Sequence, residues 1–229
     1  MKYKWLHVIA VLVIISTAVW GMSKRQSYTD ITSKEDFMEQ MVVAELPEDL
    51  AQGVCEELEK VLLEAPIVLR VSSTEDMKYS FLSGIQYVLV KDVYEGEKSL
   101  AGQRLCLNFG RWSIVLTEKY NTMQCGFVNV MKENEDYLVF LGEPYEGLGG
   151  ELIYPFWGDT YVVPMFCYTD SVNLSIPIKG ELPTYVPYIS VRNNEFFATS
   201  DSAIEELEEL KKSMLDKYPN SVNVFEAGE

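Results

Sequence analysis

Aromatic side chains gather between residues 154 and 168, and side chains of this kind line ligand-binding grooves. Grooves that bind sugars or peptides combine aromatic walls with a few polar groups. The alternative is that these residues fill the core and lid of a β-barrel, because large aromatic side chains are mostly buried. The predicted ligand-binding residues are Tyr154, Phe156, Trp157 and Tyr161, with Phe166 and Tyr168 as further members of the cluster.

The histidine content excludes several catalytic classes. The single histidine, His7, lies inside an apolar N-terminal run. The rest of the chain therefore has no histidine with which to build a Ser-His-Asp hydrolase, a Cys-His protease or a histidine-based zinc site. Paired carboxylates remain available for glycoside hydrolysis, but such pairs meet only in the folded chain. The sequence thus predicts no catalytic residue by name, no metal site and no cofactor.

Four cysteines, Cys55, Cys106, Cys125 and Cys167, leave two interpretations open. None forms a Cys-x-x-Cys pair, so a zinc ribbon or a thioredoxin-like site is not indicated. An even number in an exported domain permits disulfides. Cys106 and Cys125 are the predicted pair, because both are expected on neighbouring strands. The alternative is four buried free thiols, which pack as small hydrophobic groups.

The first 25 residues predict a membrane anchor. Lys2 and Lys4 precede an apolar run of about 18 residues, Trp5 to Met22, which suits a helix that crosses a bilayer. The expected protein is single-pass, with its C-terminal domain outside the cell membrane. The alternative is a signal peptide cleaved after Ala18, which would make the protein secreted.

The charge balance excludes one class of partner. All 35 acidic residues but only 15 of the 19 basic residues follow residue 25, which leaves that part with 20 excess negative charges. Nucleic-acid binding needs a basic face, so it is not expected. The predicted partners are the membrane, through the N-terminal helix, and a protein or cell-wall component.

Two amphipathic helices are predicted on either side of a β-rich region. Apolar residues recur at helical spacing from Pro47 to Leu62 and again over residues 201–218. Between these helices the pattern changes to alternation, which predicts strands. The expected strands are Ile67–Val71, Gly84–Tyr94, Arg104–Phe109, Trp112–Thr117, Gln124–Met131, Asp136–Leu141, Tyr161–Tyr168, Val172–Ile178 and Tyr185–Val191. Of these, Gln124–Met131 and Asp136–Leu141 are expected to form a hairpin.

The order of these elements predicts an α+β fold. A stalk over residues 26–46 would follow the anchor helix, and a β-rich extracytoplasmic domain would occupy residues 47–219. Within it, short antiparallel strands would form an OB-like barrel flanked by the two helices. Residues 220–229 are expected to be a flexible tail.

One series of motifs carries a family resemblance. A strand from Val88 ends in a Glu95-Gly96 turn, Cys125-Gly126 follows, and Tyr137–Phe140 reads Tyr-Leu-Val-Phe. This order resembles the netrin-like and tissue-inhibitor-of-metalloproteinase OB-fold domains over residues 67–141. The resemblance implies an OB-like barrel.

The inhibitory device of that family is not implied here. Those inhibitors cap a catalytic metal with a mature N-terminal cysteine, whereas the first cysteine of this chain, Cys55, lies within an expected helix. The sequence instead favours a non-enzymatic, membrane-anchored binding or interaction domain. Two alternatives stay open: a carboxylate-based hydrolase of envelope polysaccharide, and a structural ectodomain of a membrane complex.

Overall fold

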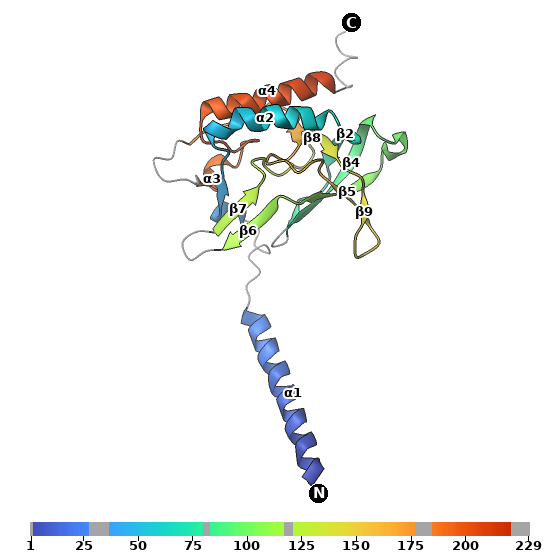
Figure 1. The fold of residues 1–229 in the computed structure, drawn as a ribbon, viewed down its shortest axis with the longest axis vertical. Helices are drawn as coiled ribbons and strands as arrows, with labels where there is room; N and C mark the ends of the chain where they lie inside the picture. The colour runs from blue at the N-terminus through green and yellow to red at the C-terminus, as the bar shows by residue number, and fades with distance from the viewer. Residues whose placement is uncertain (1, 28–36, 80–82, 117–120, 177–184, 221–229) are drawn as a thin grey trace. The chain divides into compact units, whose positions relative to one another are not determined.

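The computed structural model describes residues 2–27, 37–79, 83–116, 121–176 and 185–220. The chain divides into two compact units, residues 1–37 and residues 38–229, which are described separately (Figure 1). Parts of the expected stalk and nearly all of the expected tail lie outside the described residues.

The first unit contains helix α1 (Lys2–Ser27). A bilayer span requires an unbroken apolar helix of sufficient length, and the described part of the chain contains none. The predicted single-pass membrane anchor, and the location derived from it, are therefore wrong.

The larger sheet of the second unit forms around two long apolar strands. Its hydrogen-bonded order is β11-β8-β2-β4-β5-β10-β9, and β3 also pairs with β4. Strand β2 is buried along its whole length between β4 and β8, so it forms the centre of this sheet. The strands are β2 (Ile67–Ser73), β3 (Lys78–Tyr79), β4 (Gly84–Glu95), β5 (Arg104–Phe109), β8 (Asp136–Leu141), β9 (Tyr145–Glu146), β10 (Leu152–Pro155) and β11 (Met165–Cys167).

The smaller sheet brings distant parts of the chain together. Its order is β12-β1-β7-β6, in which β1 runs parallel to β7 and antiparallel to β12. Strands β6 and β7 form an antiparallel hairpin. The strands are β1 (Val42–Ala44), β6 (Trp112–Leu116), β7 (Asn121–Cys125) and β12 (Tyr185–Pro187).

Both predicted amphipathic helices are confirmed and lie side by side (Figure 1). Helix α2 spans Glu48–Leu62 and helix α4 spans Asp201–Lys217. The Ser200 side chain caps α4 by accepting a hydrogen bond from the Ala203 backbone N–H, as the capping role of serine predicts. Ser213 of α4 donates to Glu59 of α2 at 2.7 Å. Shorter helical segments are η2 (Met38–Gln40), η3 (Lys98–Leu100) and α3 (Tyr188–Val191).

The fold is α+β, as predicted, but the predicted OB-like antiparallel barrel is not confirmed. The described strands lie in two separate sheets, neither of which closes on itself. Two strand pairs, β1 with β7 and β5 with β10, are parallel. Parallel pairs require crossover connections that a simple antiparallel barrel lacks.

The predicted hairpin between Gln124–Met131 and Asp136–Leu141 is wrong. Strand β7 ends at Cys125 and pairs with β1 and β6, whereas β8 pairs with β2 and β11. Gly126 and Phe127 both have positive φ, 62° and 58°, a conformation that cannot continue a strand. A Cβ at residue 126 would also lie 2.6 Å from the Val163 side chain, so glycine is required there.

The predicted strands after residue 160 are also revised. Of Tyr161–Tyr168 only β11 is a strand, and the described residues of Val172–Ile178 form none. Tyr185–Val191 divides into β12 and the short helix α3. Prolines account for part of this change, because Pro164 and Pro187 lack the N–H that a central strand must donate.

One acid in the core lacks a hydrogen-bond partner for one of its carboxylate oxygens. Glu45 follows β1, is 4% exposed, and its Oε2 accepts no hydrogen bond from the described residues. Burial raises the pKa of this carboxyl from 4.5 to about 7. Between these two pH values the folded chain retains a proton that the unfolded chain releases.

The free energy of unfolding should therefore decrease as pH rises from about 4.5 to 7. The decrease due to Glu45 should reach up to about 3 kcal/mol. Urea unfolding at a series of pH values measures it, and Glu45→Gln should remove this component. The matched control is Glu133→Gln, which alters an exposed acid. Equal pH profiles for Glu45→Gln and the unmodified chain would contradict the assignment.

Candidate functional site

The predicted aromatic residues do not share one groove. Tyr154 in β10 and Phe166 in β11 are buried in the core. Phe156 lines a cavity of about 280 Å³, whereas the exposed Tyr161 lines a separate cavity of about 210 Å³. Trp157, between them, lines neither. The core interpretation thus holds for Tyr154 and Phe166. Phe156 lines the cavity that Arg111 and Asp159 also line.

Trp157 fixes the loop that follows β10. Its indole Nε1 donates to the Val61 carbonyl in the last turn of α2 at 2.9 Å, and its backbone N–H donates to the Phe140 carbonyl at 2.9 Å. The Val61 carbonyl also accepts from the Glu64 backbone N–H at 3.1 Å, so the indole is a second donor to this carbonyl. Gly158 follows with a φ of 74°, and a Cβ there would lie 2.8 Å from the Val61 side chain. The loop therefore approaches α2 as closely as its backbone allows.

The cavity of about 280 Å³, here called the Arg111 cavity, lies between this loop and the turn joining β5 to β6. Asn108 comes from β5, and Gly110 and Arg111 come from the turn that follows it. Pro155 ends β10, and the loop after it contributes Phe156, Asp159, Val163 and Pro164. Phe156 packs edge-on against Phe109, with ring centroids 4.8 Å apart, which supports one wall.

An ion pair lies among the cavity-lining residues. The Arg111 guanidinium contacts the Asp159 carboxylate. The Arg111 side chain is 43% exposed and that of Asp159 is 99% exposed, so water screens the pair. Exposed pairs of this kind contribute about 0–1 kcal/mol to stability. Asp159 is therefore a weakly held partner, and Arg111 can exchange it for another anion.

Asn108 carries an unsatisfied polar group beside this ion pair. Its Nδ2 donates to the Tyr145 hydroxyl at 2.7 Å, but its buried Oδ1 accepts no hydrogen bond from the described residues. Reversing the amide would only exchange an orphan acceptor for an orphan donor, because Tyr145 offers one hydroxyl. Such a buried group costs about 1–3 kcal/mol. Because this oxygen is fully buried, a molecule in the cavity does not reach it, and the cost belongs to the fold.

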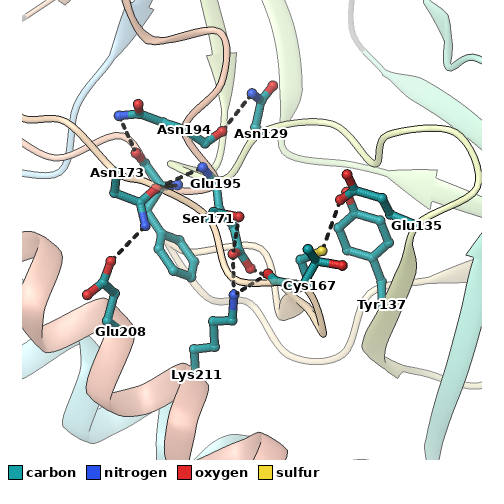
Figure 2. Close-up of polar contacts among 12 residues, drawn as sticks. Asn129, Glu135, Tyr137, Cys167, Ser171, Asn173, Asn194, Glu195, Glu208 and Lys211 are labelled. Carbon is teal, nitrogen blue, oxygen red and sulfur yellow. Dashed lines mark hydrogen bonds and ion pairs between the residues drawn. The ribbon is translucent and has the colours of Figure 1, made fainter. Parts of the chain in front are cut away.

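A second polar cluster forms a buried network (Figure 2). Lys211 extends from α4 to Glu195, where Nζ and Oε2 lie 2.6 Å apart; the two side chains are 11% and 4% exposed. Ser171 donates to the same Oε2 at 3.2 Å, and the Cys167 backbone N–H donates to Oε1 at 2.7 Å. Lys211 also donates to the Thr169 carbonyl. Both carboxylate oxygens are thus occupied by protein donors.

This network has a structural role. Burial raises the pKa of Glu195, while the Lys211 ammonium and the donated hydrogen bonds oppose that rise. Asn173 extends the network, because its Oδ1 accepts from the backbone N–H groups of Glu195 and Phe196. Its Nδ2 donates to Glu208 on α4. The network therefore joins α4 to the segment after β11 and to the segment around residues 194–196.

The four cysteines are buried free thiols in this structure. Cys106 lies in β5 and Cys125 in β7, so the predicted pair occupies different sheets rather than neighbouring strands. Cys167 Sγ donates to Glu135 at 3.2 Å (Figure 2). Burial raises the pKa of the Cys125 thiol to about 12 and that of Cys167 to about 11. Both thiols are therefore protonated, unreactive packing groups at neutral pH.

In comparisons with known proteins, no protein-family model and no curated protein matches the chain. The netrin-like resemblance over residues 67–141 therefore stays a prediction.

Sequence reasoning missed the principal polar residues of both clusters. Lys211 carried a usable signal, because it falls on the apolar stripe of α4 between Leu207 and Met214. A lysine on a buried helix face requires a buried partner. Arg111 and Asn108 carried no comparable signal, since only the fold brings their turn beside the loop after β10.

Lys211→Met should destabilise the fold by about 3–5 kcal/mol, because it leaves the Glu195 charge buried and unpaired. Urea unfolding followed by tryptophan fluorescence measures the change. Adding Glu195→Gln should restore part of the loss, since it removes the unpaired charge. The matched control is Arg192→Met in the exposed Arg192–Glu39 pair, which should cost at most about 1 kcal/mol. Similar losses for Lys211→Met and the control would contradict a buried, stabilising pair.

Proposed function

We propose that this protein is a binding domain whose ligand occupies the Arg111 cavity. The observation that carries the proposal is a weakly held Arg111 guanidinium beside the apolar walls of a cavity. A charged group with a replaceable partner, set among apolar walls, is a usual composition of a small-molecule site.

The size and walls of the cavity support this proposal. Its volume of about 280 Å³ is near the lower end of the roughly 300–1,000 Å³ typical of small-molecule sites. Phe156 and the two wall prolines provide flat apolar surface for a single ring. A ring-bearing unit of a peptide or glycan partner fits this description, as does a free small molecule. An OB-like barrel is not needed, because one turn and one loop build the cavity.

The acids near the cavity favour binding over polysaccharide hydrolysis. Hydrolysis by two carboxylates needs a pair about 5–10 Å apart across the substrate. Among the described residues that line the Arg111 cavity, Asp159 is the one acid, and it contacts Arg111. The described lining residues therefore do not include the second acid that hydrolysis by two carboxylates requires.

Gly110→Leu should block the cavity without unfolding the protein. Gly110 lines the cavity, and a Cβ at this position meets nothing within 4 Å. Saturation-transfer NMR with a library of one-ring and two-ring fragments should detect binders to the unmodified chain. At least half of these fragments should lose binding to Gly110→Leu, because the added side chain occupies their space.

The matched control is Gly53→Leu on the exposed face of α2, where a Cβ also meets nothing within 4 Å. Fragment binding to this variant should be unchanged. The proposal would be overturned if no fragment binds the unmodified chain, or if Gly110→Leu and Gly53→Leu bind the same fragments equally.

A further inference from the structure

We infer that the ligand of the Arg111 cavity is a small ring-bearing carboxylic acid. This inference rests on the proposed function and adds the chemical class of the ligand. Two features carry it: the replaceable partner of Arg111 and the apolar walls beside it.

Arg111 selects the carboxylate. It is the one cation among the described residues that line the cavity. A guanidinium binds a carboxylate through two parallel hydrogen bonds, which makes a carboxylate its best small partner. Asp159 now fills that role from an almost fully exposed position. A ligand carboxylate held inside the cavity would be less screened by water than Asp159, so it would compete favourably for Arg111.

The surrounding charge makes Arg111 the decisive contact. No lysine or arginine occurs between Lys132 and Lys179, a stretch that includes the whole loop after β10. The same stretch contains eight acidic residues. An anionic ligand therefore finds no second cation on the loop side of the cavity. Loss of Arg111 should consequently remove nearly all discrimination between a carboxylate and a neutral ligand.

The walls select a single flat ring. Phe156 and Pro155 come from the end of β10 and the residue after it, and Pro164 closes the loop side. The edge-on contact with Phe109 holds the Phe156 ring in place. The cavity volume of about 280 Å³ accommodates one substituted ring rather than a larger ligand.

Isothermal titration calorimetry with three matched probes tests the inference. The probes are 4-hydroxybenzoate, benzoate, and the neutral analogue 4-hydroxybenzamide. We expect both carboxylates to bind at least about tenfold more tightly than 4-hydroxybenzamide, because the amide leaves Arg111 without a carboxylate.

Two variants should move the affinity for 4-hydroxybenzoate in opposite directions. Arg111→Gln should weaken binding by about tenfold or more, since it removes the charged partner. Asp159→Asn should strengthen binding about two- to fivefold, because it removes the competing carboxylate. Neither variant should change the affinity for 4-hydroxybenzamide appreciably. The control is Glu39→Gln, which frees the exposed Arg192 without touching the cavity and should change nothing.

The outcomes separate the ligand class from the proposed function. Equal affinities for 4-hydroxybenzoate and 4-hydroxybenzamide would overturn the ligand class, as would weaker binding by Asp159→Asn. If fragments bind in a Gly110-dependent manner but none of the three probes does, the class is wrong and the binding function stands. If no fragment and no probe binds, both are wrong.

Discussion

The hydrogen bond from the Trp157 indole to the Val61 carbonyl is the constraint on which the Arg111 cavity depends. It fastens the loop after β10 to the end of α2. The backbone bond from Trp157 to Phe140 fastens the same loop to β8. With the side chain and the backbone of Trp157 both held, Phe156 lies on one side of it and Asp159 comes within reach of Arg111. An aromatic residue predicted to touch ligand thus supports the residues that do.

A second constraint holds the opposite part of the domain. The segments around residues 167–175 and 194–196 run beside α4 with few strand partners, so side chains satisfy much of their backbone. The buried Glu195–Lys211 pair joins these segments to α4, and Ser213 joins α4 to α2 through Glu59. Because α2 also receives the Trp157 indole, the two helices connect the buried network to the loop that forms the cavity. The domain is therefore held by side-chain hydrogen bonds where its sheets end.

Local sequence patterns predicted the elements better than their arrangement. Both long helices and the strands from Ile67 to Leu116 follow their periodicity closely, because burial of one face leaves a repeating trace. The hairpin after Cys125 failed since Gly126 and Phe127 turn the chain in a way that alternation does not reveal. The apolar N-terminal run predicted a span that the structure does not support. The sequence predicted only part of the cavity. Phe156 belongs to the predicted aromatic cluster, whereas the polar residues of the cavity depend on contacts between distant segments.

The most direct measurement is a crystal structure of the protein grown with saturating 4-hydroxybenzoate. We expect density for the ring between Phe156 and Pro164, with its carboxylate on Arg111. Asp159 should have moved away from the guanidinium. An empty cavity with the Arg111–Asp159 contact intact, or a probe bound only elsewhere on the surface, would contradict the assignment of this cavity as the binding site.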